Sequence, residues 1–377
     1  MPDDNDSVTV RSRIKATLEG RLPDRVPVSI YEMSHLALGA WYLGEPSAQP
    51  LLDSQRELGD SIVKIELNIV RWIDDPYAVQ SRSEMVGDST LTTQTIRTPQ
   101  GDLTAVYRTD PGVATTWQVK PFVESVEDAR KFLSISAENH RVDLEPLRRQ
   151  ISHAGEDAFV VVSLGDTLGY VVSLFHYDNF ALMLMDDEAL IMDMMRLTHQ
   201  ALRAGLEQVC AEARGIGFRF WGPEYAGPTL LHPRYFEKLV VNFLSELIPI
   251  VRDSGNYAVL HVHGKLRGIL DMIEALHPHA LEPLEVLPAA TADVSMEELK
   301  ERLGGKVALW GGIQCNELDN ETPEYIDVRV KEIMAAGKAG GGYLMLPTGE
   351  PIEIPISPQI AINYRAYFEA GRKYGGY

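Results

Sequence analysis

Two histidines, His261 and His263, stand two positions apart at the end of the apolar run "YAVLHVH". The run is typical of a β-strand, and Gly264 and Lys265 after it indicate a turn. Because strand residues two apart point to the same side of a sheet, both imidazoles can face one point. This spacing predicts two nitrogen ligands for one metal ion. The alternative is a pair of structural histidines held by hydrogen bonds.

Two further residues extend the candidate metal site. Glu285 ends the next strand-like run and Cys315 follows the run after that. An N/N/O/S set around an open position suits Zn²⁺, and its sulfur argues against Mg²⁺ and Ca²⁺. The simpler alternatives are a buried apolar role for Cys315 and a turn or solvated role for Glu285. Since all four residues fall at one end of consecutive predicted strands, we treat them as a candidate zinc site.

Strand-like and helix-like segments alternate through most of the chain. Eight such units are what a (β/α)₈ TIM barrel requires, and a doubly wound open sheet is the alternative. The count of eight favours the barrel. One intervening helix is expected to begin after Ser295 as N-cap and to end at a glycine pair. The predicted strands are residues 26–32, 61–67, 158–166, 218–224, 257–263, 280–285, 306–312 and 342–349.

An insertion is predicted between the second and third strands. The segment "STLTTQTIRTPQGDLTAVYRT" has two alternating runs on either side of Pro99, Gln100 and Gly101. That pattern predicts a β-hairpin at about residues 89–110. We therefore expect a single TIM-barrel domain over residues 1–377, with an acidic, flexible N-terminus at residues 1–10.

In a TIM barrel the functional residues lie at the C-terminal ends of the strands. Polar and aromatic residues occur at several of these predicted ends. Candidates to supply a proton or a hydrogen bond in catalysis are Asp166, Glu224 and Tyr225. Candidates for substrate binding, the last two by stacking on an aromatic ring, are Glu32, His35, Tyr170 and Trp221.

Composition excludes several classes of partner. The chain has 35 basic and 54 acidic residues, a formal charge of −19, which repels phosphate backbones and anionic lipid. No nucleic-acid or membrane partner is expected. With two cysteines there is no disulfide framework, and the acidic start does not resemble a signal peptide. No apolar run approaches the roughly 20 residues of a membrane span. These features predict a cytoplasmic protein, and a homodimer is compatible with them.

Several segments together carry a family resemblance. "LEGRLPDRVPVSIYE", "GPEYAGPTLLHPRYFEKLVV", "HVHGK" and "GGYLMLPTGEPIEIPISPQIAINYRAYFEAGRKYG" occur in the order of an opening helix and first strand, a fourth-strand loop, a fifth-strand motif and a last strand with its helix. This order resembles the uroporphyrinogen decarboxylase superfamily over nearly the whole chain. The resemblance implies a barrel fold and an enzyme.

The resemblance favours one branch of that superfamily. The true decarboxylases are metal-free and grip an acid-rich tetrapyrrole with arginines after the first strand. Here that place reads "YEMSHLALGAWYLG", which contains no arginine. Several substrate carboxylates without those cations would be hard to hold, so the sequence argues against uroporphyrinogen as the substrate.

The other branch contains zinc-dependent, cobalamin-linked methyltransferases, whose barrel is similar to that of cobalamin-independent methionine synthase. By resemblance His261 matches the first metal ligand, His263 stands where a cysteine is usual, and Glu285 matches the glutamate. The strand-eight cysteine of that branch is missing from "LPTGEP", which leaves Cys315, Glu350 or water as the fourth ligand. A less sulfur-rich zinc is the stronger Lewis acid, suited to an ether or alcohol oxygen.

Three hypotheses follow. The first is a zinc-dependent methyltransferase that removes a methyl group from a methoxylated or similar small compound and passes it to a corrinoid protein, which supplies the corrinoid. The second is a metal-independent decarboxylase or lyase of the same superfamily acting on an unidentified carboxylic acid. The third is a non-catalytic protein that binds a tetrapyrrole or corrinoid.

Overall fold

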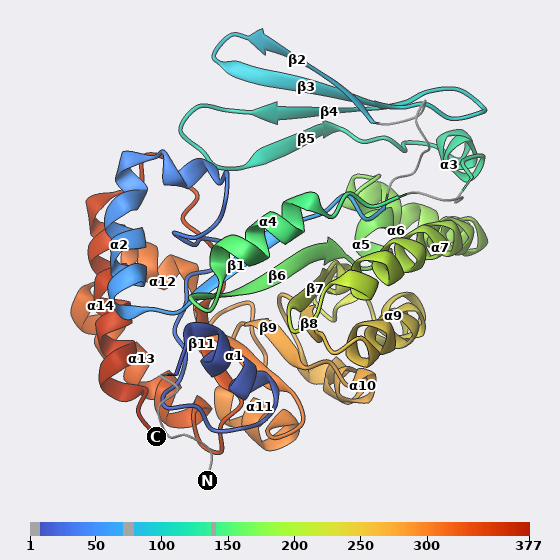
Figure 1. The fold of residues 1–377 in the computed structure, drawn as a ribbon. Coiled ribbons are helices and arrows are strands. Elements are labelled where there is room, and N and C mark those ends of the chain that lie inside the picture. The colour runs from blue at the N-terminus through green and yellow to red at the C-terminus, as the bar shows by residue number, and fades with distance from the viewer. Residues whose placement is uncertain (1–7, 71–78, 137–140) are drawn as a thin grey trace.

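A curled parallel sheet forms the centre of the computed structural model, which describes residues 8–70, 79–136 and 141–377. Its seven strands follow one another in the sheet in chain order, and helices surround them (Figure 1). Several of these strands are apolar throughout because both faces are covered. The strands are β1 (Ser61–Glu66), β6 (Ala158–Gly165), β7 (Gly217–Trp221), β8 (Tyr257–His261), β9 (Ala280–Leu284), β10 (Ala308–Ile313) and β11 (Tyr343–Pro347).

Residues 26–32 do not form the first predicted strand. Val28 makes one isolated parallel bridge with Met345, and its carbonyl accepts a hydrogen bond from the Asp60 amide at 2.7 Å. The segment thus runs between the two edge strands, β11 and β1. Pro27 has no amide hydrogen, which limits a regular ladder there. The fold is TIM-barrel-like, with seven of the eight predicted strands formed.

The helices of the described chain lie mainly between successive strands of the parallel sheet. One of them confirms a cap read from the sequence, because the Ser295 side chain accepts a hydrogen bond from the Glu298 amide. The α-helices are α1 (Val10–Leu18), α2 (Gln49–Leu58), α3 (Val126–Leu133), α4 (Glu145–Ala154), α5 (Thr167–Val172), α6 (Tyr177–Asp186), α7 (Glu188–Glu212), α8 (Pro233–Phe236), α9 (Asn242–Asp253), α10 (Leu270–Leu276), α11 (Met296–Leu303), α12 (Cys315–Asn320), α13 (Pro323–Gly337) and α14 (Pro358–Tyr374).

A four-stranded antiparallel sheet follows β1 and stands apart from the parallel sheet (Figure 1). It contains β2 (Gln80–Val86), β3 (Ser89–Ile96), β4 (Leu103–Thr109) and β5 (Thr116–Lys120). The sequence predicted only the central pair. The sheet is tied down at both sides: Gln118 donates to the Ser173 carbonyl at 3.2 Å, and Val113 bridges to Glu353. It therefore connects the region after β6 with the region after β11.

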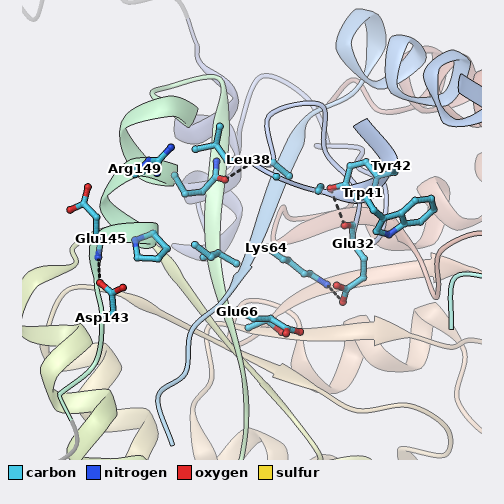
Figure 2. A pocket seen from close by; sticks show the side chains of 16 residues that line it. Glu32, Leu38, Trp41, Tyr42, Lys64, Glu66, Asp143, Glu145 and Arg149 are labelled. Atoms are coloured by element: carbon cyan, nitrogen blue, oxygen red, sulfur yellow. Dashed lines mark hydrogen bonds and ion pairs between the residues drawn. The ribbon is translucent and has the colours of Figure 1, made fainter. Parts of the chain in front are cut away.

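The inner face of the parallel sheet changes from apolar to polar along the strands. On β1, Ile62, Lys64 and Glu66 follow one another at intervals of two residues, so all three point to the same side of the sheet. Nearer the amino-terminal ends of the strands, this face is covered by an apolar cluster that packs with α1 and includes Phe159, Val161, Val259 and Trp310. The next inward positions are polar. Lys64 and Glu66 thereby reach a cavity at the carboxyl end of β1 (Figure 2).

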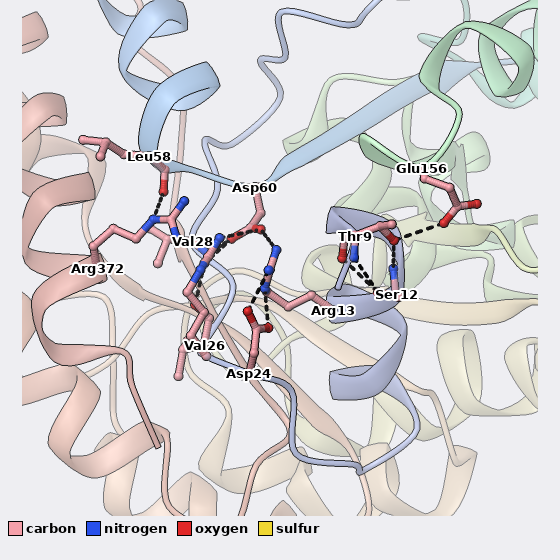
Figure 3. Close-up of polar contacts among 11 residues, drawn as sticks. Thr9, Ser12, Arg13, Asp24, Val26, Val28, Leu58, Asp60, Glu156 and Arg372 are labelled. Carbon is pink, nitrogen blue, oxygen red and sulfur yellow. Dashed lines mark hydrogen bonds and ion pairs between the residues drawn. The ribbon is translucent and has the colours of Figure 1, made fainter. Parts of the chain in front are cut away.

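A buried ion-pair network secures the amino-terminal side of β1 (Figure 3). The fully buried Asp60 carboxylate accepts hydrogen bonds from Arg13 at 2.7 Å and from Arg25 at 2.6 and 2.9 Å. It also accepts one from the Val28 amide at 3.0 Å. Asp60 thus joins α1, the segment before Val28 and β1.

The N-terminal prediction lies mostly outside the described residues, because 1–7 are not among them; Thr9 already caps α1. Within the described ranges, no helix has both the length and the apolar character needed to cross a bilayer.

The Asp60 network yields a stability prediction. Asp60→Ala should lower the free energy of unfolding by about 3–5 kcal/mol, because the buried Arg25 guanidinium loses its carboxylate partner and Arg13 keeps only Asp24. Urea denaturation at neutral pH measures this loss. Asp53→Ala, which breaks an exposed pair with Arg56, should cost less than about 1 kcal/mol. Equal losses of unfolding free energy in the two variants would show that the Asp60 network does not stabilise the amino-terminal side of β1.

Candidate active site

Arg219 is the centre of a buried polar group at the carboxyl ends of the strands. Its side chain is 6% exposed. The guanidinium donates to Glu282 Oε1 at 2.5 Å, to Ser163 Oγ at 3.0 Å and to His261 Nδ1 at 2.9 Å. It also pairs with Glu32 at 3.0 Å. These contacts join β6, β7, β8, β9 and the segment before α2.

Lys64 completes the charge balance of this group. Its ammonium lies 3.1 Å from Glu32 Oε1 and 3.4 Å from Glu282 Oε1, and 4.1 Å from the centre of the Tyr31 ring. Burial alone would raise the pKa of Glu282, but Lys64 and Arg219 hold it well below its usual range. Two cations therefore face two carboxylates in the interior.

Glu32 reaches this group from a left-handed backbone conformation, with φ of +59°. Such a conformation is costly for a residue with a β-carbon and is found at functional sites. The sequence predicted Glu32 as a substrate-binding residue. In the structure it is held by Lys64 and Arg219 and lines the large cavity.

The two predicted histidine ligands lie side by side but have different partners. Their ring centres are 4.7 Å apart, and the rings are nearly perpendicular. His261 is buried and accepts from Arg219, and burial with this cation lowers its pKa to about 3. His263 lies just beyond the end of β8, with Nδ1 2.7 Å from Glu285 Oε1.

The four predicted zinc ligands are not brought to one point. His263 and Glu285 form a pair, and Glu285 Oε2 is buried without a hydrogen-bond partner. His261 instead faces a guanidinium, which repels a second cation. Cys315 begins α12 beside Thr348 and Gly349. Across the described residues, no three His, Cys, Asp or Glu side chains are grouped as a metal site would require. The His263–Glu285 pair fits zinc; the complete set does not fit as arranged.

Asp166 and Glu224, two predicted proton donors, lie near one another at the ends of β6 and β7. Asp166 caps α5 by accepting from the Gly169 amide at 2.6 Å, while Oδ2 is buried without a partner. Burial raises its pKa well above the usual value, and Glu224 adds to the rise. Burial also raises the pKa of Glu224. Both carboxyls are therefore biased toward the protonated form.

Two glycines allow this close packing. A β-carbon on Gly222, whose φ is +115°, would meet Gly169 Cα at 2.4 Å and Asp166 Oδ1 at 2.6 Å. Because the chain is so tight here, Trp221 packs against Tyr170 with ring centres 5.6 Å apart. The two residues predicted to stack on a substrate ring thus lie beside each other.

The structure places Tyr225 near Glu224 and Asp166, and His35 beside α2. Tyr225 stacks on Tyr177 with ring centres 6.0 Å apart, and its pKa is raised by burial. His35 Nδ1 lies 3.2 Å from Gln55 Oε1 on α2, and His35 does not line the cavities described below. Its contacts are those of a structural residue.

Two cavities open at this end of the sheet. The larger, of about 960 Å³, lies between α4 and residues 37–42, with Trp41, Tyr42, Lys64 and Glu66 around it (Figure 2). The smaller, of about 310 Å³, is lined by Tyr170 and Trp221. Glu66 and Ser163 line both, so the cavities adjoin.

Glu350 lies within the electrostatic field of the same group. Burial and then the Glu32 charge raise its pKa to about 7, against the opposing effect of Lys64 and Arg219. Burial and Glu32 also raise the pKa of Glu66. These carboxyls receive less compensation than Glu282 does.

Comparisons with known proteins give the family. The model described as uroporphyrinogen decarboxylase (URO-D) matches residues 119–358, more than half of the chain. The chain belongs to this family. The superfamily prediction from the sequence is thereby confirmed. None of the curated proteins matches the chain.

One solved structure agrees with this chain in fold. A methyltransferase from Methanosarcina mazei matches with a TM-score of 0.61 and 15% identity, over 98% of this chain and 99% of that one. A B12-independent methionine synthase from Shewanella sp. W3-18-1, in complex with selenomethionine, matches with a TM-score of 0.37 and 14% identity, over 86% and 85% of the two chains.

The His261 environment predicts its titration. Because the folded pKa of about 3 lies below the roughly 6.5 of an unfolded histidine, the unfolded chain binds a proton that the folded chain does not. Stability should therefore fall as pH drops below about 6.5. Long-range ¹H–¹⁵N NMR should show His261 neutral at pH 5. Its titration between pH 5 and 8 would contradict the assigned contact with Arg219.

Proposed function

We propose that this chain removes a methyl group from a small methoxylated or similar compound and transfers it to the corrinoid of a partner protein. Family membership and the fold of the Methanosarcina methyltransferase support a transferase. The observation that carries the proposal is a cavity large enough for a small substrate, lined by Glu66 and by Glu32, whose charge also raises the pKa of Glu350.

The chemistry needs a proton at the departing oxygen. Attack by reduced corrinoid on the methyl carbon breaks the carbon–oxygen bond: R–O–CH₃ + Co(I) + H⁺ gives R–OH and CH₃–Co(III). Charge develops on oxygen as the bond breaks, and a carboxylic acid near its pKa can donate there. Glu350, with a pKa of about 7, suits this role at neutral pH.

In this proposal Lys64 and Arg219 position neighbouring groups and do not donate a proton to the substrate. Both are tied to Glu32 and Glu282 by contacts of 2.5 to 3.4 Å. Because Glu32 and Glu282 neutralise them, the two cations hold the surrounding strands in place and do not bind a substrate anion. This balance also disfavours the decarboxylase alternative, because a carboxylic-acid substrate would find both interior cations already paired.

Zinc belongs to this proposal through one pair. His263 and Glu285 would hold the ion, and zinc when bound would supply Lewis-acid activation of the departing oxygen. Burial opposes ionisation of Glu285, but hydrogen bonds, first that of His263, lower its pKa, so that it can bind a cation as a carboxylate. Cys315 is not expected to take part, since its contacts lie with Thr348 and Gly349.

The pH dependence of methyl transfer tests the function. With reduced corrinoid and a panel of methoxybenzenes, visible absorption should show Co(I) replaced by methyl-Co(III), with one equivalent of the demethylated alcohol or phenol. The rate should fall as pH rises through about 7, because Glu350 loses its proton. Glu350→Gln should lower the rate about 10²–10⁴-fold and abolish the fall in rate above about pH 7.

Glu353→Gln is the matched control, because Glu353 is exposed on the same segment and should leave rate and pH profile unchanged. Absence of methyl-Co(III) with every donor would contradict the proposed transfer. If the rate of Glu350→Gln still falls as pH rises through about 7, a group other than Glu350 donates the proton.

Metal analysis tests the zinc part separately. Purified protein should carry about one zinc per chain, and His263→Ala with Glu285→Gln should lose it. Cys315→Ser should keep the wild-type content, since this side chain lies with another group of residues. Negligible zinc in the wild type would rule zinc out of the proposal, as would equal zinc in the wild type and the double variant.

A further inference from the structure

The antiparallel sheet has two edge strands, and they differ in how they are covered. On β5 the pairing with β4 shifts register between Val106 and Tyr107, and the Gln118 carbonyl lies 3.1 Å from His176 Nε2. A register shift and an occupied carbonyl protect an edge from further pairing. β2 forms the opposite border of the sheet and, among the described residues, pairs only with β3 (Figure 1). β2 is therefore the edge that is open to another strand.

The β2 strand lacks the usual features that protect an edge. All seven of its residues are exposed, and it pairs with β3 in an unbroken register from Gln80 to Val86. It contains no proline and no bulge. A long, regular edge strand presents a row of unpaired backbone groups to any strand that can lie beside it.

The turn after β2 determines which backbone groups point outward. Two residues separate Val86 from Ser89, so these two paired residues form a hydrogen-bonded pair. Because such pairs alternate along an antiparallel ladder, the even-numbered residues of β2 direct their amides and carbonyls to β3. The odd-numbered residues direct theirs to the open side of the strand. They are Ser81, Ser83 and Met85.

Two opposite charges on β2 make the strand complementary to itself. Arg82 and Glu84 flank Ser83, are exposed, and form no ion pair within the described part of the chain. When two copies pair antiparallel about an axis at Ser83, Arg82 of each copy lies opposite Glu84 of the other. These are non-hydrogen-bonded pairs, in which side chains approach most closely. An axis at Arg82 or at Glu84 would instead place like charges opposite each other.

We infer that two copies of this chain associate through β2, antiparallel and with two-fold symmetry centred on Ser83. The two sheets then join into one continuous sheet with four strands from each copy. The sheet stands apart from the parallel sheet, so β2 lies at the periphery of the molecule (Figure 1). A single pair of strands is a small interface, so we expect a dimer that dissociates at micromolar concentrations. The inference is independent of the proposed reaction.

Sedimentation velocity on the full chain, from about 1 to 200 µM, tests the association. The dimer fraction should rise across this range. Ser83→Pro should leave the chain monomeric, because proline has no amide hydrogen to donate to the second copy. The Ser83 amide does not bond to β3, so this substitution should preserve the sheet. Unchanged far-UV circular dichroism and thermal unfolding would establish that the variant is folded.

A charge exchange tests the register. Arg82→Glu or Glu84→Arg alone places like charges opposite each other twice in the dimer, and should raise the dissociation constant at least about tenfold. The double variant Arg82→Glu with Glu84→Arg restores both opposite pairs and should recover the wild-type constant. Lys331→Glu makes an equal change of charge at an exposed position on α13 and should have no effect.

Three results would overturn the inference. The first is a wild-type chain that stays monomeric throughout the range, which would leave the β2 edge to a strand of another protein. The second is a dimer that persists in folded Ser83→Pro, since another surface would then hold it. The third is a double charge variant that dimerises no better than the two single variants, because the pairing would then not be centred on Ser83.

Discussion

A guanidinium buried among the carboxyl ends of the strands is the constraint on which this site depends. Arg219 cannot be removed from water without strong partners, because an uncompensated buried charge costs several kcal/mol. Its partners come from three strands, β6, β8 and β9, and from the segment before α2, so meeting this requirement fixes the positions of these elements relative to β7. Glu282 and His261, paired across β8 and β9, are held in one orientation by the same group.

The charge balance around Arg219 also affects the protonation of the other carboxyl groups at the carboxyl ends of the strands. Lys64 and Arg219 offset Glu32 and Glu282, and little positive charge remains for the other acids. Glu66, Glu224 and Glu350 have raised pKa values, first because they are buried and, for Glu66 and Glu350, also because of the Glu32 charge. Glu350, with a pKa of about 7, is in this way available as the proton donor of the proposed reaction at neutral pH.

Much of the fold was predictable from the apolar runs in the sequence. Seven of the strand segments were found because continuous burial on both faces leaves a strong pattern. The segment at 26–32 has the composition of a strand, yet Pro27 and its position between two edges reduce it to one bridge. Strands β2 and β5 were missed because they are largely exposed; β2 has no apolar alternation, and β5 alternates only over Trp117 and Val119.

The site was predicted less completely, for reasons that lie in particular residues. The closeness of His263 and Glu285 followed from strand-end position, whereas Arg219, the hydrogen-bond partner of His261, was not identified from the sequence. Lys64, Arg219 and Glu282 each stand inside an apolar strand, "SIVKIE", "GFRFW" and "ALEPL". Charged residues in such runs must find buried partners, and that signal could have indicated the network. Their mutual pairing, and the separation of Cys315, depend on how the sheet curls and need the structure.

A double-mutant cycle on Arg219 and Glu282 measures the central interaction most directly. Arg219→Met and Glu282→Leu should each destabilise the chain by about 3–5 kcal/mol in urea unfolding, because each leaves the other charge buried with less compensation. The combined variant should cost less than the sum of the single losses by at least about 2 kcal/mol. Losses that add to within about 0.5 kcal/mol would show that the two residues act independently, and would contradict the network on which the site is built.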